Sequence, residues 1–259
     1  MNKLDLSVVL TTHLRPKLLI RALESLLNQT NTNFQIILCS DEGSQDTKDV
    51  ARNHLRDGDS LLILPHLKGP SQTRNEGVRN VKYKNLIFLD DDDTFDANYL
   101  EDIINKIRSS PNALYYSNFT RVEEERGTEN IVIQTTSKIH QANNLTNILV
   151  GNYIPNNSFV VDSSIAKSIL FDSSLGSHED WDYLIQLSKA LDFVHVDVYG
   201  PRVHIVKSES RNNSSYQNGS VGLDYLAIYR KHRVATPDVR VARQSQLQAF
   251  GISVPVDLL

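Results

Sequence analysis

Leu86-Ile87-Phe88-Leu89 runs directly into Asp90-Asp91-Asp92-Asp93, and this stretch decides how the chain is interpreted. Four consecutive apolar residues predict a buried strand of a parallel sheet. Four carboxylates cannot be buried without partners, because an isolated charge is costly away from water. We therefore expect the acids at the carboxyl end of the strand, in a crevice where open α/β sheets bind ligands. A divalent cation would balance them, because Mg²⁺ and Mn²⁺ prefer carboxylate oxygens. The alternative is a solvated acidic turn.

Composition narrows the class of protein. The 259 residues are 40% hydrophobic and 22% charged, which is ordinary for a globular protein of one large domain or two small ones. The net charge of −4 gives no sign of nucleic-acid binding. A single cysteine, Cys39, cannot form an internal disulfide, which fits a cytoplasmic protein. We expect no transmembrane segment and no signal peptide, and peripheral association with the inner face of a membrane is compatible with this.

Strands and helices alternate through the first hundred residues. Apolar runs predict the strands, and helical periods with capping residues lie between them. The predicted strands are Leu6–Thr11, Phe34–Cys39, Leu61–Leu64 and Leu86–Leu89, and the predicted helices start at Pro16, follow the cap Ser44, and cover Ser71–Arg79 and Ala97–Ser109. This order predicts a parallel, doubly wound α/β sheet. No G-x-G-x-x-G or P-loop motif occurs in it, which disfavours ordinary dinucleotide and P-loop sites.

The pattern changes after Pro111, and the second half is more variable. We expect a single domain made of a nucleotide-binding half, residues 1–110, and a second half, residues 111–259. The predicted strands are Ala113–Val122 and Ile131–Thr135 around a charged turn Glu123–Glu129, then Phe193–Val198 and Arg202–Val206. The predicted helices are Ser163–Leu170, Glu179–Ala190 and Gly222–His232, and the predicted polar loops are Gly151–Ser158 and Ser208–Ser220.

Five short motifs occur in an order that resembles the family 2 glycosyltransferases, which have the GT-A fold. They are Thr11-Thr12-His13, Asp41-Glu42-Gly43-Ser44, Thr73-Arg74-Asn75, Asp90-Asp91-Asp92 and Glu179-Asp180. The second departs conservatively from the family's Asp-Asp-Gly-Ser, and the fourth matches its Asp-x-Asp metal motif. Each motif alone is common, whereas their order and spacing, from Ser7 to about Ser210, are specific.

The resemblance implies a fold and a reaction. The fold is a Rossmann-like, mostly parallel sheet flanked by helices, with a mixed acceptor-binding half. The reaction is the metal-dependent, inverting transfer of a sugar from a nucleotide-diphospho-sugar, with UDP as the first expectation, to a hydroxyl of a glycan, a glycolipid or a lipid-linked acceptor. The processive signature Gln-x-x-Arg-Trp is missing after Gln186, so we expect one transfer per encounter.

The resemblance assigns donor-binding roles residue by residue. Asp41 would accept a hydrogen bond from the base, with a helix-capping carboxylate as the alternative. Arg74, at a helix start, suits the diphosphate, with a surface ion pair as the alternative. Asp91 is the implied ribose contact, and Asp90 would support the metal through its shell. The full donor set is Thr11, His13, Arg15, Asp41, Arg74, Asp90 and Asp91, in which His13 is as compatible with an ordinary exposed histidine.

The metal, Mn²⁺ or Mg²⁺, is assigned to Asp92 and His204. Imidazole tolerates Mn²⁺, and a structural histidine on a strand is the alternative for His204. Asp180 is the implied general base that removes the proton of the acceptor hydroxyl, with an acidic first helical turn as the alternative. On the acceptor side we place Asn156, Glu179 and Trp181, although Trp181 is as compatible with the core.

Two rival functions use the same residues. Four apolar residues before Asp90-x-Asp92-x-Thr94 also resemble the first motif of haloacid-dehalogenase-like phosphatases, with Asp90 as nucleophile and Asp92 as acid/base. That motif normally follows the first strand of its fold, whereas three β/α units precede it here. The second rival is a catalytically inactive nucleotide-sugar-binding module, which intact Asp92 and Asp180 argue against.

Overall fold

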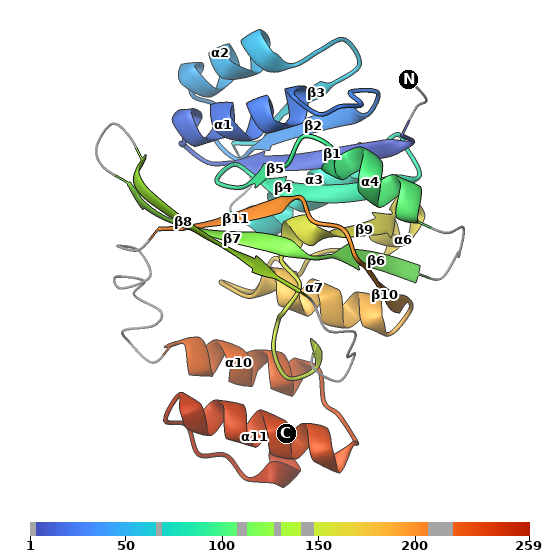
Figure 1. Cartoon of the computed structure of the whole chain (residues 1–259). Coiled ribbons are helices and arrows are strands. Elements are labelled where there is room, and N and C mark those ends of the chain that lie inside the picture. The colour runs from blue at the N-terminus through green and yellow to red at the C-terminus, as the bar shows by residue number, and fades with distance from the viewer. Residues whose placement is uncertain (1–3, 66–68, 108–112, 127–130, 141–147, 207–219) are drawn as a thin grey trace.

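The centre of the molecule is a seven-stranded sheet with the order β10-β6-β9-β4-β1-β2-β3 (Figure 1). The structure is a computed structural model that describes residues 4–65, 69–107, 113–126, 131–140, 148–206 and 220–259. The first half alternates β1 (Leu6–Thr12), α1 (Pro16–Leu27), β2 (Gln35–Ser40), α2 (Gln45–His54), β3 (Ser60–Ile63), α3 (Pro70–Arg79), β4 (Asn85–Asp90), β5 (Thr94–Phe95) and α4 (Tyr99–Lys106). β1, β2, β3 and β4 pair in parallel, which confirms the predicted sheet.

The apolar runs become strands because helices cover both faces of the sheet. Leu86 and Phe88 of β4 face one core, which α3, α6, α7 and the C-terminal helices complete. Ile87 and Leu89 face the other core, which α1, α2 and α4 complete. All four side chains are fully buried, and burial of each contributes about 1.5–3 kcal/mol. The strand therefore has a fixed position, and the acids that follow it are fixed at its end.

Helix α3 lies unusually close to the sheet at Gly77. A Cβ atom at this position would lie 2.5 Å from Val9 Cγ1 and 3.0 Å from Cys39 Sγ. Only glycine leaves room for this approach. Because Arg74 lies one turn earlier in α3, the same contact sets how far the Arg74 side chain reaches along the end of the sheet.

The second half adds strands to the central sheet and forms a second sheet with the order β5-β11-β7-β8. Its strands are β6 (Ala113–Ser117), β7 (Phe119–Arg126), β8 (Ile131–Ile139), β9 (Phe159–Asp162), β10 (Asp192–Val196) and β11 (Pro201–Val206). The single predicted strand Ala113–Val122 is therefore wrong, because it divides at Asn118 between the two sheets. The Asn118 side chain donates to Asp197 Oδ1 at 2.8 Å, and its backbone N–H donates to the carbonyl of Val198 at 3.0 Å. These bonds fix the crossing point. The predicted charged turn Glu123–Glu129 is also wrong in its first part, which continues β7.

Strand β9 was not predicted from the sequence. It lies between β4 and β6 and is antiparallel to both. The short 3₁₀ helix η1 (Asn156–Ser158) precedes it, so the predicted loop Gly151–Ser158 lies next to the end of β4. This places polar residues of the second half beside the acidic run of the first half.

The helices of the second half are α6 (Ser163–Ser168), α7 (Glu179–Ser188), α10 (Ser220–Lys231) and α11 (Pro237–Ala249), and η2 (Val256–Leu258) follows them. Helix α11 was not predicted. In Figure 1, α7 lies between the central sheet and α10, and α11 lies beyond α10. The predicted loop Ser208–Ser220 lies outside the described residues, except for Ser220, which begins α10.

A buried polar cluster joins α7 to α10. Asp182 has no exposed surface, and its Oδ1 lies 2.6 Å from His232 Nε2 and 2.8 Å from Lys231 Nζ. Lys231 also pairs with Asp172, just before α7. Burial alone would raise the pKa of Asp182, but the hydrogen bonds from His232 and Lys231 outweigh it, and the pKa is lowered overall. The cluster ties the C-terminal helices to the helix that carries Glu179 and Asp180.

Candidate functional site

The ends of β1 and β4 meet at the acidic run. Thr11 and Asp90 are register partners in the parallel pair, so both side chains reach the same edge of the sheet. The Thr11 hydroxyl donates to Asp90 Oδ1 at 2.8 Å, and the backbone N–H of Asp91 donates to the carbonyl of Thr11 at 3.1 Å. The predicted convergence of these residues at the strand ends is therefore observed.

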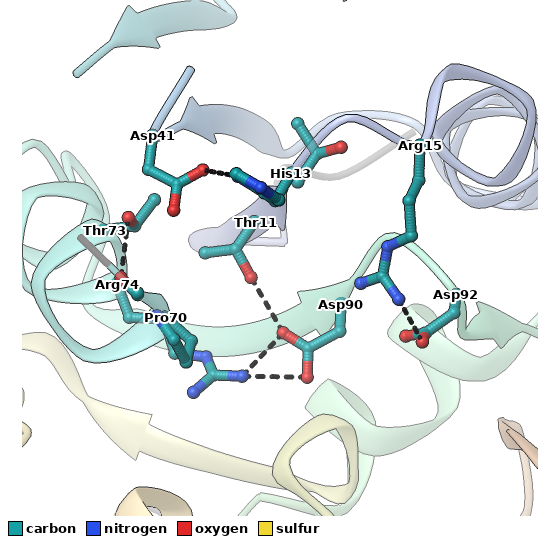
Figure 2. A pocket seen from close by; sticks show the side chains of 11 residues that line it. Thr11, His13, Arg15, Asp41, Pro70, Thr73, Arg74, Asp90 and Asp92 are labelled. Atoms are coloured by element: carbon teal, nitrogen blue, oxygen red, sulfur yellow. Dashed lines mark hydrogen bonds and ion pairs between the residues drawn. The ribbon is translucent and has the colours of Figure 1, made fainter. Parts of the chain in front are cut away.

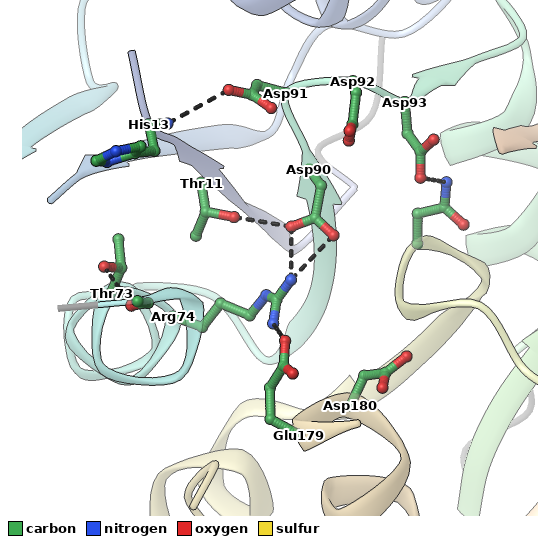
Figure 3. Close-up of polar contacts among 12 residues, drawn as sticks. Thr11, His13, Thr73, Arg74, Asp90, Asp91, Asp92, Asp93, Glu179 and Asp180 are labelled. Carbon is green, nitrogen blue, oxygen red and sulfur yellow. Dashed lines mark hydrogen bonds and ion pairs between the residues drawn. The ribbon is translucent and has the colours of Figure 1, made fainter. Parts of the chain in front are cut away.

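Arg74 bridges the two halves of the molecule. Its Nη2 donates to both carboxylate oxygens of Asp90, at 2.8 and 2.9 Å, and its Nη1 donates to Glu179 Oε1 at 2.7 Å (Figure 3). Only 6% of the Arg74 side chain is exposed. Burial opposes the charge of Arg74, but Asp90 and Glu179 outweigh it and raise its pKa above the ordinary value. In the same way, burial opposes the charge of Asp90, but Arg74 lowers the pKa of Asp90 overall. Arg74 and Asp90 are therefore charged, and the bridge to Glu179 brings the start of α7 to the end of β4.

Successive acids of the run face opposite ways. Asp90 and Asp92 line a cavity, whereas Asp91 is fully buried and Asp93 is turned toward Asn157 and His204. Asp91 is fully buried and is held by the Thr12 hydroxyl, 2.6 Å from its Oδ2, and by Arg15 Nη2, 2.5 Å from its Oδ1. Burial raises the pKa of Asp91 to about 6. The predicted contact between Asp91 and a ribose is not supported, because its carboxylate lies behind the cavity wall.

Asp92 presents a partly accessible carboxylate to the cavity. Its side chain is 29% exposed, and its Oδ2 accepts from Arg15 Nη1 at 2.8 Å. Arg15 thus holds Asp91 behind the wall and Asp92 in front of it. Asp93 takes no part in the cavity: it accepts from the Asn157 amide at 2.9 Å and from the backbone N–H of His204 at 2.9 Å. Burial raises the pKa of Asp93 well above its ordinary value.

The cavity at the strand ends has a volume of 470 Å³, which is in the range of small-molecule sites (Figure 2). At its far side, Asp41 Oδ1 lies 2.7 Å from Nδ1 of His13, and the His13 ring is 61% exposed. The cavity is lined by Thr11, Thr12, His13, Arg15, Asp41, Gly69, Pro70, Thr73, Arg74, Asp90 and Asp92. Six of the seven predicted donor residues are therefore brought together, and Asp91 is the exception.

The charges that line the cavity decide what it can hold. Three carboxylates (Asp41, Asp90, Asp92) face two guanidinium groups (Arg15, Arg74), so the lining alone does not favour a diphosphate. Among the described residues, no three His, Cys, Asp or Glu side chains are arranged to hold a metal ion by themselves. Mg²⁺, however, is usually held by one or two carboxylates together with substrate phosphates. The accessible carboxylate of Asp92 fits that kind of site.

Asp180 lies in the first turn of α7, beside the Glu179 that pairs with Arg74 (Figure 3). The amide of Asn152 donates to its Oδ2 at 2.9 Å. Burial, followed by the charge of Glu179, raises the pKa of Asp180 above its ordinary value, although Arg74 opposes this. A carboxylate with a raised pKa is a stronger proton acceptor than an ordinary one.

Two of the predicted acceptor-side residues are buried. Trp181 has no exposed surface, and its indole N–H donates to the carbonyl of Ile148 at 2.6 Å. An indole without exposed surface cannot contact an acceptor, so the acceptor-side placement of Trp181 is wrong and the core alternative holds. Asn156 is 8% exposed, and its side-chain amide has no hydrogen-bond partner among the residues that the structure describes. The third, Glu179, pairs with Arg74 as described above.

His204, the second predicted metal ligand, has protein atoms at both ring nitrogens. Its Nδ1 lies 3.2 Å from Glu124 Oε2, and its Nε2 lies 3.0 Å from the Thr94 hydroxyl. The side chain is 6% exposed. Its role as a ligand stays a prediction.

Sequence reasoning missed several residues of the site. Gly69 and Pro70 line the cavity, as does Thr73, which belongs to the quoted motif Thr73-Arg74-Asn75 but had no role assigned, and Asn152 and Asn157 hold Asp180 and Asp93. The signal for the first group was the Gly-Pro pair before a helix, where Gly69 has a φ of +81° that favours glycine. The two asparagines lie in the predicted polar loop Gly151–Ser158, but nothing in the sequence shows that strand β9 brings this loop to the site.

The sequence also matches a known protein family. The model of a family described as "Glycosyl transferase family 2" matches residues 7–167. The chain belongs to glycosyl transferase family 2. It is therefore an enzyme that transfers a sugar, and neither the phosphatase nor the inactive module is favoured for this family 2 glycosyltransferase.

Curated relatives match over different lengths. An uncharacterized glycosyltransferase of Haemophilus influenzae is 26% identical over 254 residues, which are 95% of this chain and 82% of the relative. The GalNAc(5)-diNAcBac-PP-undecaprenol beta-1,3-glucosyltransferase of Campylobacter jejuni is 34% identical over 104 residues, 39% of this chain and 34% of that enzyme. An uncharacterized Rickettsia bellii glycosyltransferase is 29% identical over 46% of this chain, and the match spans only 17% of its own length.

Solved structures confirm the predicted GT-A class of fold. Staphylococcus aureus TarS in complex with UDP superposes with a TM-score of 0.62 at 16% identity, over 96% of this chain and 72% of that one. The mannosyltransferase PcManGT of Pyrobaculum calidifontis, in complex with GDP-Man and Mn²⁺, superposes with a TM-score of 0.64 at 10% identity, over 98% and 77%. In the part of this chain that the structure describes, no helix is both long and apolar enough to cross a bilayer.

Proposed function

We propose that this family 2 glycosyltransferase moves a sugar from a nucleotide-diphospho-sugar to a hydroxyl of a glycan or lipid-linked glycan, with inversion at the anomeric carbon. The observation that carries the proposal is the Asp90–Arg74–Glu179 bridge. It joins a cavity at the strand ends to the helix turn that holds Asp180, so donor and base would lie on either side of one arginine.

UDP is the proposed nucleotide, as in the TarS complex, which shares the fold. Asp41 at the end of β2 is available to accept from a base N–H, and His13 holds its carboxylate in place. Thr11 and Thr73 bring hydroxyl groups to the cavity, and Arg15 brings a guanidinium group. Arg15 and Arg74 suit the diphosphate, because planar guanidinium groups pair well with phosphate oxygens.

Asp92 is the residue proposed to hold Mg²⁺ or Mn²⁺ together with the diphosphate oxygens. A divalent cation there would supply positive charge against the diphosphate as it leaves. Support comes from the donor set of the cavity, in which carboxylates outnumber guanidinium groups. The PcManGT complex, which contains Mn²⁺ and a nucleotide sugar, offers the same combination on the same fold.

Asp180 is the proposed general base. It takes the proton of the acceptor hydroxyl while the acceptor oxygen forms its bond to the anomeric carbon, and the bond from that carbon to the diphosphate oxygen breaks. The electron pair of the broken bond goes to the nucleoside diphosphate. The raised pKa of Asp180 suits the task, and Asn152 orients the carboxylate.

The acceptor is proposed from chemistry and from one relative. The Campylobacter enzyme is named for an undecaprenol-linked glycan. An acceptor of this class would draw the present enzyme to the cytoplasmic surface of a membrane.

Thermal unfolding with nucleotides tests the donor and the metal together. UDP with MnCl₂ at about 100 times the dissociation constant should stabilise the fold by about 2.7 kcal/mol, which raises Tm by roughly 5–10 °C. Asp92→Asn should remove the manganese-dependent part of the shift, whereas Asp46→Asn, an exposed carboxylate in α2, should not. The proposal fails if UDP, GDP and dTDP leave Tm unchanged with and without manganese.

A further inference from the structure

A buried ionic cluster lies directly behind the acidic run. Glu124 of β7 has no exposed side-chain surface, and its Oε2 lies 3.0 Å from Arg21 Nη1 and 3.2 Å from His204 Nδ1. Arg21 belongs to α1 and His204 to β11, so the cluster joins the central α/β unit to the second sheet. In the parallel pair of β7 and β11, His204 faces Val122, two residues before Glu124, which puts both acid and imidazole on one face.

Two members of the cluster, Arg21 and His204, contact the end of the acidic run. Arg21 Nη2 donates to the backbone carbonyl of Asp92 at 2.5 Å. The backbone N–H of His204 donates to Asp93 Oδ1 at 2.9 Å. The His204 ring lies 3.0 Å from the hydroxyl of Thr94. Three consecutive residues, 92 to 94, are thus attached to members of one buried cluster.

Such a cluster is costly to bury and is poor evidence for stability, because apolar residues of the same volume often stabilise a fold equally well. The effect of the cluster is instead to fix the position of the acidic run. Four adjacent carboxylates repel one another, and a turn with these charges would open unless its backbone were fixed. The Arg21 contact fixes the backbone at Asp92 and leaves the Asp92 carboxylate to face the cavity.

We propose that Arg21, Glu124 and His204 are positioning residues that set the place of the Asp92 carboxylate for the metal–diphosphate complex. This inference rests on the proposed function of Asp92. His204 acts through its ring and its backbone N–H from behind the run and does not bind the metal. Outer groups of this kind typically change metal affinity about 10–100-fold when they are removed.

The test is the apparent affinity for Mn²⁺ in the presence of saturating UDP, measured by calorimetric titration of the full chain. Arg21→Lys keeps the charge but loses the fork that contacts both Glu124 and the Asp92 carbonyl. Glu124→Gln removes the charge at the centre. Each should weaken Mn²⁺ binding about tenfold or more and leave metal-free UDP binding unchanged. Glu123→Gln is the matched control, because Glu123 is the next residue of β7 and pairs with Arg121 at the surface.

A fourth variant separates positioning from ligation. His204→Asn keeps the backbone N–H that holds Asp93 and loses the ring contacts, so it should weaken Mn²⁺ binding to the same extent as Glu124→Gln. A loss confined to His204→Asn, with Arg21→Lys and Glu124→Gln unchanged, would make His204 a ligand and overturn the inference. The inference is also overturned if all four variants bind Mn²⁺ with the affinity of the wild type. Failure of the wild type to bind Mn²⁺ with UDP would instead refute the proposed function. Thermal melts without ligand show whether each variant folds, and Arg21→Lys, the mildest change, carries the test if Glu124→Gln does not fold.

Discussion

Replacing Arg74 by lysine should separate the two halves of the site. Arg74 makes two hydrogen bonds to Asp90 and one to Glu179, all charge-assisted and all between 2.7 and 2.9 Å. Lysine has a compact ammonium group in place of the fork, so one carboxylate loses its partner. Breaking a buried ion pair costs about 3–5 kcal/mol. Asp90 and Glu179 keep 27% and 15% of their side-chain surface exposed, and water can partly replace the lost partner. We therefore expect the low end of that range, about 3 kcal/mol.

Urea unfolding and thermal melts measure this loss directly. For a domain of this size, about 3 kcal/mol corresponds to a fall in Tm of roughly 6–12 °C. Sugar transfer should fall further than stability explains, because a displacement of about 1 Å at a catalytic group costs about 100-fold. Arg52→Lys is the control, since Arg52 pairs with Asp49 at 2.9 Å but is 72% exposed, and such pairs contribute less than about 1 kcal/mol. The reasoning is refuted if Arg74→Lys is no more destabilising than Arg52→Lys.

Two further predictions concern the supports of the site. Gly77→Ala should cost about 1–3 kcal/mol in unfolding free energy, because the new Cβ would overlap Val9. Gly176→Ala should cost much less, because no atom of the described residues lies within 4 Å of its new Cβ, and equal losses would contradict the packing argument. Because the folded-state pKa of Asp182 is lowered, its stabilising contribution is complete above the ordinary pKa of about 3.9 and is lost as pH falls through the lower folded-state value. Asp182→Asn should therefore cost about 3 kcal/mol at neutral pH and flatten the loss of stability below about pH 4, and parallel wild-type and variant profiles in urea unfolding at several pH values would count against it.

The first half of the fold was predictable because its information is local. The strands are mostly apolar runs, the helices between them show apolar periods, and alternation of the two dictates a parallel sheet whose strand ends meet. Ser44 shows how far this goes: it was predicted as a cap, and its hydroxyl does accept from the backbone N–H of Thr47. The convergence of Thr11, Asp41 and Asp90 follows from the same reasoning.

The second half depends on pairings between distant residues. Strand β9 is four residues long, and nothing in its sequence shows that it inserts between β4 and β6. The switch between sheets at Asn118 depends on Asp197, 79 residues away. Helix α11 was missed because its buried face includes Arg243, whose guanidinium donates to the carbonyls of Leu149 and His232. A buried arginine interrupts the apolar period by which a helix is recognised.

The sequence also does not show which of the four aspartates face the cavity. Four identical residues give no local signal, and partners from elsewhere in the chain, such as Arg15 for Asp91 and Asn157 for Asp93, decide which way each side chain turns. His204 is a similar case, because its partner Glu124 comes from another strand of the second sheet.

The most direct test of the central claim compares Asp180→Asn with the wild type in two assays, nucleotide binding and sugar transfer. Loss of a general base should lower kcat about 100-fold to 10,000-fold, while UDP and Mn²⁺ raise Tm as much as they do in the wild type. An Asp180→Asn enzyme that transfers or hydrolyses the donor at the wild-type rate would contradict the account.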